Sequence, residues 1–98
     1  MAGSEETRRI ARLRQATSID ELHAVLTAAL QARDYESLVI KRSGDKCYLV
    51  VAHRGSAHVY VDHHGKQVIR RHAWQIREWL NRAFGIDPRD VPVERLAR

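Results

Sequence analysis

The sequence has only one cysteine, Cys47, and no long apolar run. A single cysteine excludes a disulfide within the chain, which favours a reducing compartment. No segment approaches the roughly 18 consecutive apolar residues of a membrane span, so we expect no membrane partner. The opening residues, MAGSEETRRIARLR, lack the apolar segment of a secretory signal. Together these absences predict a cytoplasmic protein.

The motifs of common enzymes and metal sites are also missing. There is no nucleophile elbow, no P-loop and no Gly-rich dinucleotide turn. Zinc sites usually take two close pairs of Cys or His ligands, and no cysteine pair is present. Cys47 lies among apolar residues, where a thiol is usually inert packing. We therefore assign no catalytic residue, expect no metal and no cofactor, and favour a protein that is not an enzyme, with an enzymatic alternative left open.

Acidic residues are fewer than basic ones. The chain has 17 Lys and Arg against 12 Asp and Glu, a formal net charge of +5. Such an excess attracts anionic partners over long distances. The first partner to expect is RNA or DNA, and the next is an acidic protein.

The length of 98 residues fits one small domain. We expect a basic helix or arm over residues 1–17, a core over residues 18–86 and a tail over residues 87–98. A chain this short buries only about 60–65% of its unfolded surface. Self-association would enlarge the core, so a homodimer is predicted.

Two helices are predicted from capping motifs and apolar periodicity. Ser18 to Glu21 forms a capping box, and apolar residues then recur at helical spacing to about Arg33. A second helix runs from about residue 72 or 73 to Phe84, with Gly85 as a left-handed C-cap and Ile86 making the accompanying apolar contact.

Between the helices the apolar period changes to two, which predicts strands over residues 37–42, 47–53 and 57–62, with a fourth over 67–71. Two-residue turns are expected at Gly44-Asp45 and His64-Gly65, and a three-residue turn at residues 54–56. The resulting register places these pairs on one face: Ile40 with Leu49, Leu38 with Val51, Val51 with Val59, and Val61 with Val68. The predicted fold is α+β, in the order α-α-β-β-β-(β)-α, an antiparallel three- or four-stranded meander with helices on one face.

The same register places Tyr48, His58 and Tyr60 on the second face of the sheet. Three coverings of that face are open: the N-terminal helix, a second copy of the chain, or nucleic acid stacked on the tyrosines.

The most informative segment is the hairpin Ala57–His72 with Trp74 just beyond it. It holds four histidines, three cations and two aromatic residues, and Asp62 is its only acid. Alternation along a strand would point His63 and His64 to opposite faces, which argues against a metal cluster. Trp74 lies off the apolar arc of the last helix, either folded onto the sheet edge or exposed as an anchor. The residues predicted to bind nucleic acid are Lys41, Arg54, His58, Tyr60, Lys66, Arg70, Arg71, Trp74 and Arg77.

The order of helix, three-stranded meander and helix over about residues 19–86 is similar to the double-stranded-RNA-binding-like fold, which includes HicA-type RNA-cleaving toxins. In those toxins a Gly-Ser-His element enters a strand, and the nearest stretch here is Gly55-Ser56-Ala57-His58, with one additional alanine. The resemblance implies a small ribonuclease with His58 as general base.

Three functions therefore remain open. The first is a non-enzymatic nucleic-acid-binding or regulatory protein that uses the basic and aromatic hairpin. The second is a protein-interaction module, as a homodimer or an adaptor for an acidic partner. The third is the RNA-cleaving domain with His58 as base.

Overall fold

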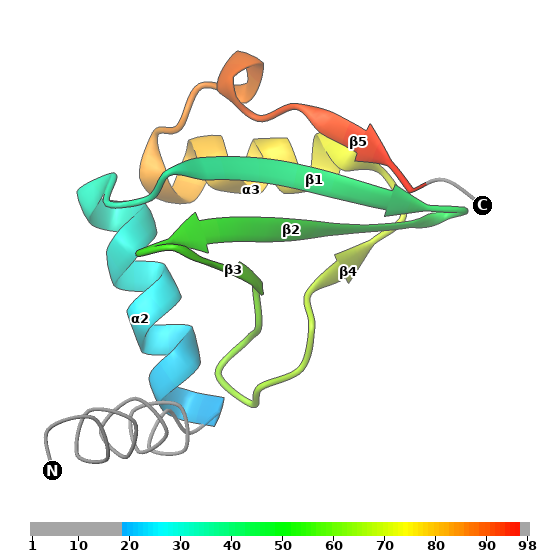
Figure 1. Cartoon of the computed structure of the whole chain (residues 1–98). Helices are drawn as coiled ribbons and strands as arrows, with labels where there is room; N and C mark the ends of the chain where they lie inside the picture. The colour runs from blue at the N-terminus through cyan, green and yellow to red at the C-terminus, as the bar shows by residue number, and fades with distance from the viewer. Residues whose placement is uncertain (1–18, 97–98) are drawn as a thin grey trace, which may run out of the picture.

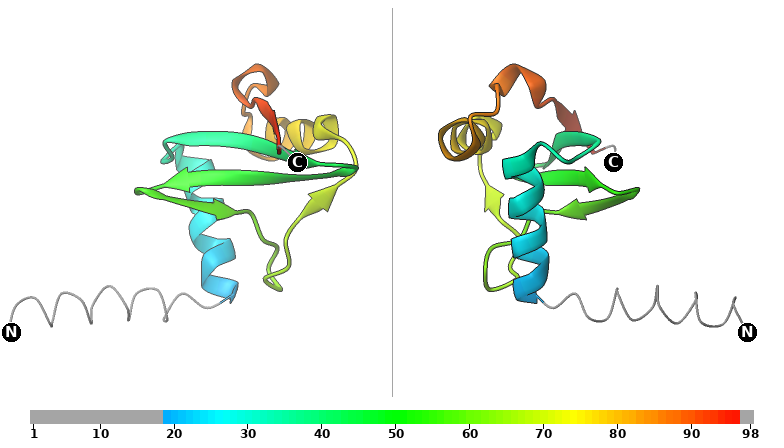
Figure 2. Two further views of the ribbon diagram at one scale, coloured as in Figure 1. Left: turned by 45° about the vertical axis from the view of Figure 1, so that its right-hand side comes forward. Right: turned by 90° about the vertical axis from the view of Figure 1, so that its left-hand side faces the viewer.

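The computed structural model describes residues 19–96, in which two α-helices pack on one face of a five-stranded sheet (Figures 1 and 2). This arrangement confirms the α+β class. The predicted N-terminal helix and the Ser18 cap lie outside the described residues. The elements are α2 (Ile19–Ala32), β1 (Ser37–Ser43), β2 (Lys46–His53), β3 (Ser56–Val59), β4 (Ile69–Arg70), α3 (Ala73–Phe84), the 3-10 helix η1 (Pro88–Asp90) and β5 (Val93–Arg95).

The hairpin of β1 and β2 forms the centre of the sheet, and its predicted register is confirmed. Ser43 pairs with Lys46 across the two-residue turn, so Ile40 lies opposite Leu49 and Leu38 opposite Val51. These four apolar residues are buried under the helices. Because side chains alternate along each strand, this register fixes which side chains line the core.

The pairing of β2 with β3 differs from the prediction by one residue. The turn has two residues, Arg54 and Gly55, with φ of 51° and 81°. Positive φ at both positions is the requirement of a type I′ hairpin turn. Val51 therefore lies opposite His58, and the predicted pairing of Val51 with Val59 is wrong. A shift of one residue exchanges the two faces, so Tyr60 turns toward the helices.

After Val59 the chain leaves the edge of β2 and forms a loop before it returns as β4. The loop projects toward the first turns of α2 (Figures 1 and 2). An isolated bridge joins Val61 to Gln67, so the predicted pairing of Val61 with Val68 is also wrong. β4 then pairs with the first half of β2, while β3 pairs with its second half. The loop closes differently because the Asp62 carboxylate accepts hydrogen bonds from the backbone N–H groups of His64 and Lys66.

β5 is an element that the sequence did not predict, and it makes the sheet mixed. It runs parallel to β1 and extends the strand order to β3-β2-β1-β5. The backbone N–H of Ile40 donates to the carbonyl of Pro92 at 2.8 Å. Val91, just before the strand, is completely buried. Part of the segment expected to be a tail therefore completes the edge of the sheet and the core.

The helices follow their predicted patterns closely. α2 buries Leu26, Ala29 and Leu30, although Val25 in the same stripe is 44% exposed. α3 ends at Gly85, whose φ of 70° is left-handed, and its N–H bonds the carbonyl of Asn81. Ile86 is buried beside it, as the capping motif predicts.

Candidate nucleic-acid interface

The β1–β2 turn, the end of β5 and the connection from β4 to α3 meet at one end of the sheet (Figure 1), and the residues of these segments are rich in Lys and Arg. We call this surface the basic end. It differs from the predicted hairpin surface because β4 returns to β2 and β5 joins β1. Its residues are Arg42, Lys46, Arg70, Arg71 and Arg95.

Three of these arginines form one row across four strands. Arg95 of β5 pairs with Arg42 of β1, and Arg42 pairs with Cys47 of β2. Cys47 in turn pairs with Arg70 of β4. Residues paired across neighbouring strands share a face, and strands lie about 4.8 Å apart. The row therefore spans about 14 Å, which is long enough to contact more than one phosphate.

The cations of the basic end lack acidic partners among the described residues. The ion pairs within residues 19–96 use Lys41, His53, Arg54, Arg82 and Arg89 instead. Arg42 Nη1 contacts the Cys47 sulfur at 3.9 Å, and Arg70 Nη1 donates to the carbonyl of Ile69. Two acids adjoin these cations in sequence: Asp45 precedes Lys46, and Glu94, which pairs with Lys41, precedes Arg95. The net positive charge of this end is thus open to an anionic ligand.

Trp74 stands exposed in the first turn of α3, four residues after Arg70. Its side chain is 59% exposed. The ring of His72 lies nearly parallel to it, with centroids 6.2 Å apart and planes 13° apart. The expectation of an exposed indole is therefore met, and the alternative that it folds onto the sheet edge is not. Such a ring is a surface on which a base can stack.

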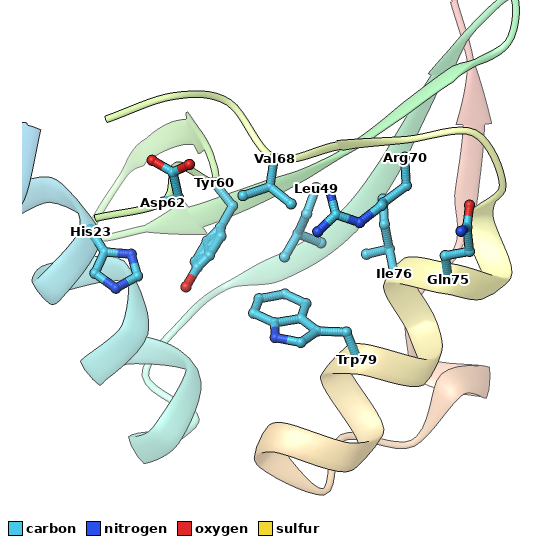
Figure 3. A pocket seen from close by; sticks show the side chains of 9 residues that line it. All are labelled: His23, Leu49, Tyr60, Asp62, Val68, Arg70, Gln75, Ile76 and Trp79. Carbon is cyan, nitrogen blue, oxygen red and sulfur yellow. The ribbon is translucent and has the colours of Figure 1, made fainter. Parts of the chain in front are cut away.

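A pocket of about 220 Å³ lies between α2, the loop after β3 and α3 (Figure 3). Its apolar base includes the buried side chains of Leu49, Tyr60 and Ile76. The half-buried indole of Trp79 forms a wall and contacts the Tyr60 ring, with centroids 5.0 Å apart. The remaining lining residues are His23, Asp62, Val68, Arg70 and Gln75.

Polar groups of several kinds surround this pocket. His23 Nδ1 lies 2.9 Å from the carbonyl of Val61; a carbonyl only accepts, so Nδ1 donates and Nε2 is an acceptor in the neutral ring. The backbone hydrogen bond from Lys66, followed by that from His64, lowers the pKa of Asp62 and keeps it ionised. Arg70 and Asp62 lie at opposite ends, with Val68 and Leu49 between them (Figure 3).

Three of the predicted phosphate ligands make other interactions in the structure. Lys41 forms an ion pair with Glu94 of β5 at 2.5 Å. Arg54 lies in the β2–β3 turn, highly exposed and 3.5 Å from Asp34. Arg77 donates from Nε and Nη2 to the carbonyl of Val91. These three residues do not belong to the basic end.

Tyr60 and His58 turn toward the helix side of the sheet, contrary to the predicted facing. Tyr60 is 4% exposed, and its hydroxyl lies 3.0 Å from the Thr27 hydroxyl of α2. Its ring therefore cannot pair with Tyr48 as a stacking surface on the outer face. His58 is half-buried opposite Val51, and no hydrogen bond or ion pair joins its ring to another described residue.

The loop after β3 brings together histidines that alternation would separate. Residues His63 and His64 lie in a turn, not in a strand, and their ring centroids are 3.9 Å apart. The expectation that they face opposite ways is wrong for that reason. Lys66 is exposed in the same loop, away from β4. Within residues 19–96, no three His, Cys, Asp or Glu side chains are arranged to hold a metal ion.

Sequence reasoning missed Arg42, Lys46 and Arg95. The first two flank the predicted Gly44-Asp45 turn, so their position at a sheet end was available from the hairpin register. Nothing in the sequence indicated the position of Arg95. Its short strand follows a proline-containing segment and pairs with a strand far away in the chain. The pocket residues His23 and Trp79 were missed because the pocket forms only where α2, the loop after β3 and α3 come together.

The second face of the sheet carries a half-exposed apolar strip. Tyr48 lies there, as predicted, and Ile69 opposite it is 42% exposed. Val50 and Val59 pair on the same face. No helix in the described part of the chain covers this strip (Figure 2). One alternative predicted that the N-terminal helix covers this strip, but that helix lies outside the described residues.

Comparisons with protein-family models, curated proteins and solved structures find no match for this chain. The resemblance to the double-stranded-RNA-binding-like fold therefore stays a prediction from element order. Within residues 19–96, neither helix has the length and apolar character that crossing a membrane requires.

Proposed function

We propose that this protein binds nucleic acid through the basic end of its sheet. The observation that carries the proposal is the row of Arg95, Arg42 and Arg70 across four strands, without acidic partners among the described residues. Cations held at fixed positions on a sheet suit the phosphates of a nucleic-acid backbone. Lys46 and Arg71, which directly neighbour Cys47 and Arg70 in the chain, add charge along the turn side of the row.

Two further features support nucleic acid over another anionic partner. The exposed indole of Trp74 follows Arg70 and Arg71 closely in sequence and offers a ring for base stacking. The overall charge of +5 adds long-range attraction that would speed association. An acidic protein could also form ion pairs with these cations, but it has no bases to stack on Trp74.

The direct test compares two double variants that remove the same charge. Arg42→Gln with Arg95→Gln removes two cations of the basic end. Arg82→Gln with Arg89→Gln removes two exposed arginines that are paired with Glu78 and Asp87. Binding of fluorescent RNA and DNA oligonucleotides is measured by anisotropy from about 50 mM to 200 mM salt, where phosphate contacts weaken steeply.

The basic-end double variant should lose at least about tenfold in affinity, and its salt slope should fall by about 1.4–1.8 for two lost phosphate contacts. The paired-arginine double variant should keep most of the affinity and the slope. Equal losses in both would show that net charge, not this surface, determines binding. Absence of binding by the wild-type protein at about 50 mM salt would refute the proposal.

A second candidate is self-association through the apolar strip, with a second copy of the chain as its occupant. It rests on Ile69, which is 42% exposed, and on the half-exposed Tyr48, Val50 and Val59 beside it. Sedimentation equilibrium of the wild-type protein and of Ile69→Lys tests it. A dimer that Ile69→Lys converts to monomer supports this surface, and a wild-type monomer at high concentration excludes it.

A further inference from the structure

The pocket of about 220 Å³ between α2 and α3 lies directly beside the basic end, because Arg70 belongs to both. Figure 3 shows the Arg70 side chain extending from β4 over the pocket, on the side of Ile76 and Gln75. The neighbouring Arg71 does not line the pocket. A ligand held at the row of arginines therefore has a cavity next to it.

The size and the walls of the pocket restrict what it can hold. Its volume is below the range of about 300–1,000 Å³ for sites that take drug-sized molecules, so it admits a single ring system. Leu49, Ile76 and Tyr60 make the base apolar, and the indole of Trp79 adds an aromatic wall. These surfaces favour a flat, aromatic group.

The polar groups of the rim add a second restriction. The Asp62 carboxylate accepts two backbone hydrogen bonds through Oδ1, which leaves Oδ2 as an acceptor. Gln75 accepts from the His72 N–H through Oε1, so its amide NH2 group is a donor. A nucleobase carries both donors and acceptors on its edge and is flat, whereas an acyl chain has no use for these groups.

We infer that this pocket receives one unpaired base of a bound strand, with Arg70 on the adjacent phosphate. The inference rests on the proposed nucleic-acid binding and narrows it to single-stranded RNA or DNA, since a base within a duplex cannot leave the stack without cost. The same nucleotide chemistry could come from a free mononucleotide, and the experiment separates the two sources.

Trp79 provides the readout within the pocket. The chain has two tryptophans, so Trp74→Phe leaves Trp79 as the only one while keeping an aromatic ring at position 74. This variant is titrated at about 50 mM salt with a single-stranded oligonucleotide, with the duplex of the same sequence, with an abasic strand of the same length, and with mononucleotides. Binding is followed by anisotropy of the labelled strands and by Trp79 emission.

The base-containing strand should bind at least about fivefold more tightly than the abasic strand and should change Trp79 emission. The abasic strand and the duplex should bind through their phosphates and leave the emission unchanged. Val68→Phe, which fills the pocket, should lower the affinity for the base-containing strand to the affinity for the abasic strand.

Arg70→Gln and Arg71→Gln form a matched pair, because both remove one cation from the basic end. Both should weaken binding of the abasic strand equally. Arg70→Gln should also reduce the preference for the base-containing strand, and Arg71→Gln should leave it intact. This comparison keeps the inference testable even if Val68→Phe fails to fold.

Equal affinity for the base-containing and abasic strands, with unchanged Trp79 emission, would overturn the inference and leave the proposed function standing. Failure of every strand to bind would overturn the proposed function and the inference with it. A change of Trp79 emission with mononucleotides, when no strand binds, would overturn the inference that the base comes from a bound strand. It would assign the pocket to a free nucleotide.

Discussion

Arg77 of α3 holds the carbonyl of Val91 with two hydrogen bonds, 2.9 Å from Nε and 2.7 Å from Nη2. Val91 is completely buried and leads through Pro92 into β5. The arginine therefore ties the last helix to the segment that carries the edge strand. Its guanidinium acts as a structural clamp at the side of the sheet.

Arg77→Met should lower the free energy of unfolding by about 1–3 kcal/mol, because it leaves a buried carbonyl without its charged donors. Arg82→Met on the same helix removes only an exposed ion pair with Glu78 and should cost about 0–0.5 kcal/mol. Urea denaturation of both variants checks the difference. The salt slope of nucleic-acid binding should be unchanged by Arg77→Met, and a decrease of about one would instead show that Arg77 contacts a phosphate.

The β2–β3 turn should accept asparagine in place of Arg54. Arg54 has a φ of 51°, a left-handed conformation that strains most side chains, and Asn-Gly is the preferred pair for a type I′ turn. Arg54→Asn should raise the free energy of unfolding by about 0.5 kcal/mol, since the exposed pair with Asp34 contributes little.

Gly55→Ala is the opposite control at the next position. An added Cβ would meet no atom within 4 Å. Any loss in the free energy of unfolding therefore comes from the strained backbone conformation alone, with φ of 81°. A loss of about 1–2 kcal/mol is expected by urea denaturation. Stabilisation by Gly55→Ala, or a large loss in Arg54→Asn, would show that the turn is not of this type.

Glu36 should make folding sensitive to acid. Its carboxylate accepts hydrogen bonds from the backbone N–H groups of Gly55 at 2.6 Å and Arg54 at 3.0 Å. The bond from Gly55 is the main cause that lowers the pKa of Glu36 in the folded state. A carboxyl with a depressed folded pKa stabilises the protein above its unfolded pKa, about 4.3, and this contribution is lost as the pH falls through the folded pKa.

The melting temperature should therefore decrease as the pH is lowered below about 4, and the decrease should be smaller for Glu36→Gln. Asp62 and Asp87, whose pKa values are also lowered, add to the wild-type decrease in the same direction. Thermal melts of both proteins across this pH range provide the measurement. Parallel curves for wild type and Glu36→Gln would show that the Gly55 contact does not stabilise the fold.

Cys47 should be unreactive while the protein is folded. Its sulfur is fully buried, 3.8 Å from the carbonyl of Arg71, to which the thiol donates. A reagent must reach the sulfur to modify it, and a fully buried sulfur is reached only when the surrounding strands open. A thiol reagent such as dithionitrobenzoate should modify the protein slowly in buffer and rapidly in urea. Fast modification of the native protein would mean that the strands around Cys47 open readily.

Local patterns in the sequence determined much of the fold. The helix over residues 19–32, the β1–β2 hairpin with its Gly44-Asp45 turn, and the Gly85 cap of the last helix all depend on nearest neighbours in the chain. Apolar periodicity and positive-φ preferences act over a few residues, so they can be recognised without knowing what packs nearby. The basic character of the residues around Arg70 and Trp74 was equally visible.

Only the tertiary structure decided which of those residues share a surface. A turn of two residues at Arg54-Gly55 moved Tyr60 from the outer face into the core, because side chains alternate with a period of two. The return of β4 to β2 and the parallel pairing of β5 aligned Arg70, Arg42 and Arg95, which lie up to 53 positions apart in the chain. Backbone hydrogen bonds between distant strands carry no mark in the side-chain pattern, and for that reason the alignment of these three arginines could not be predicted from the sequence.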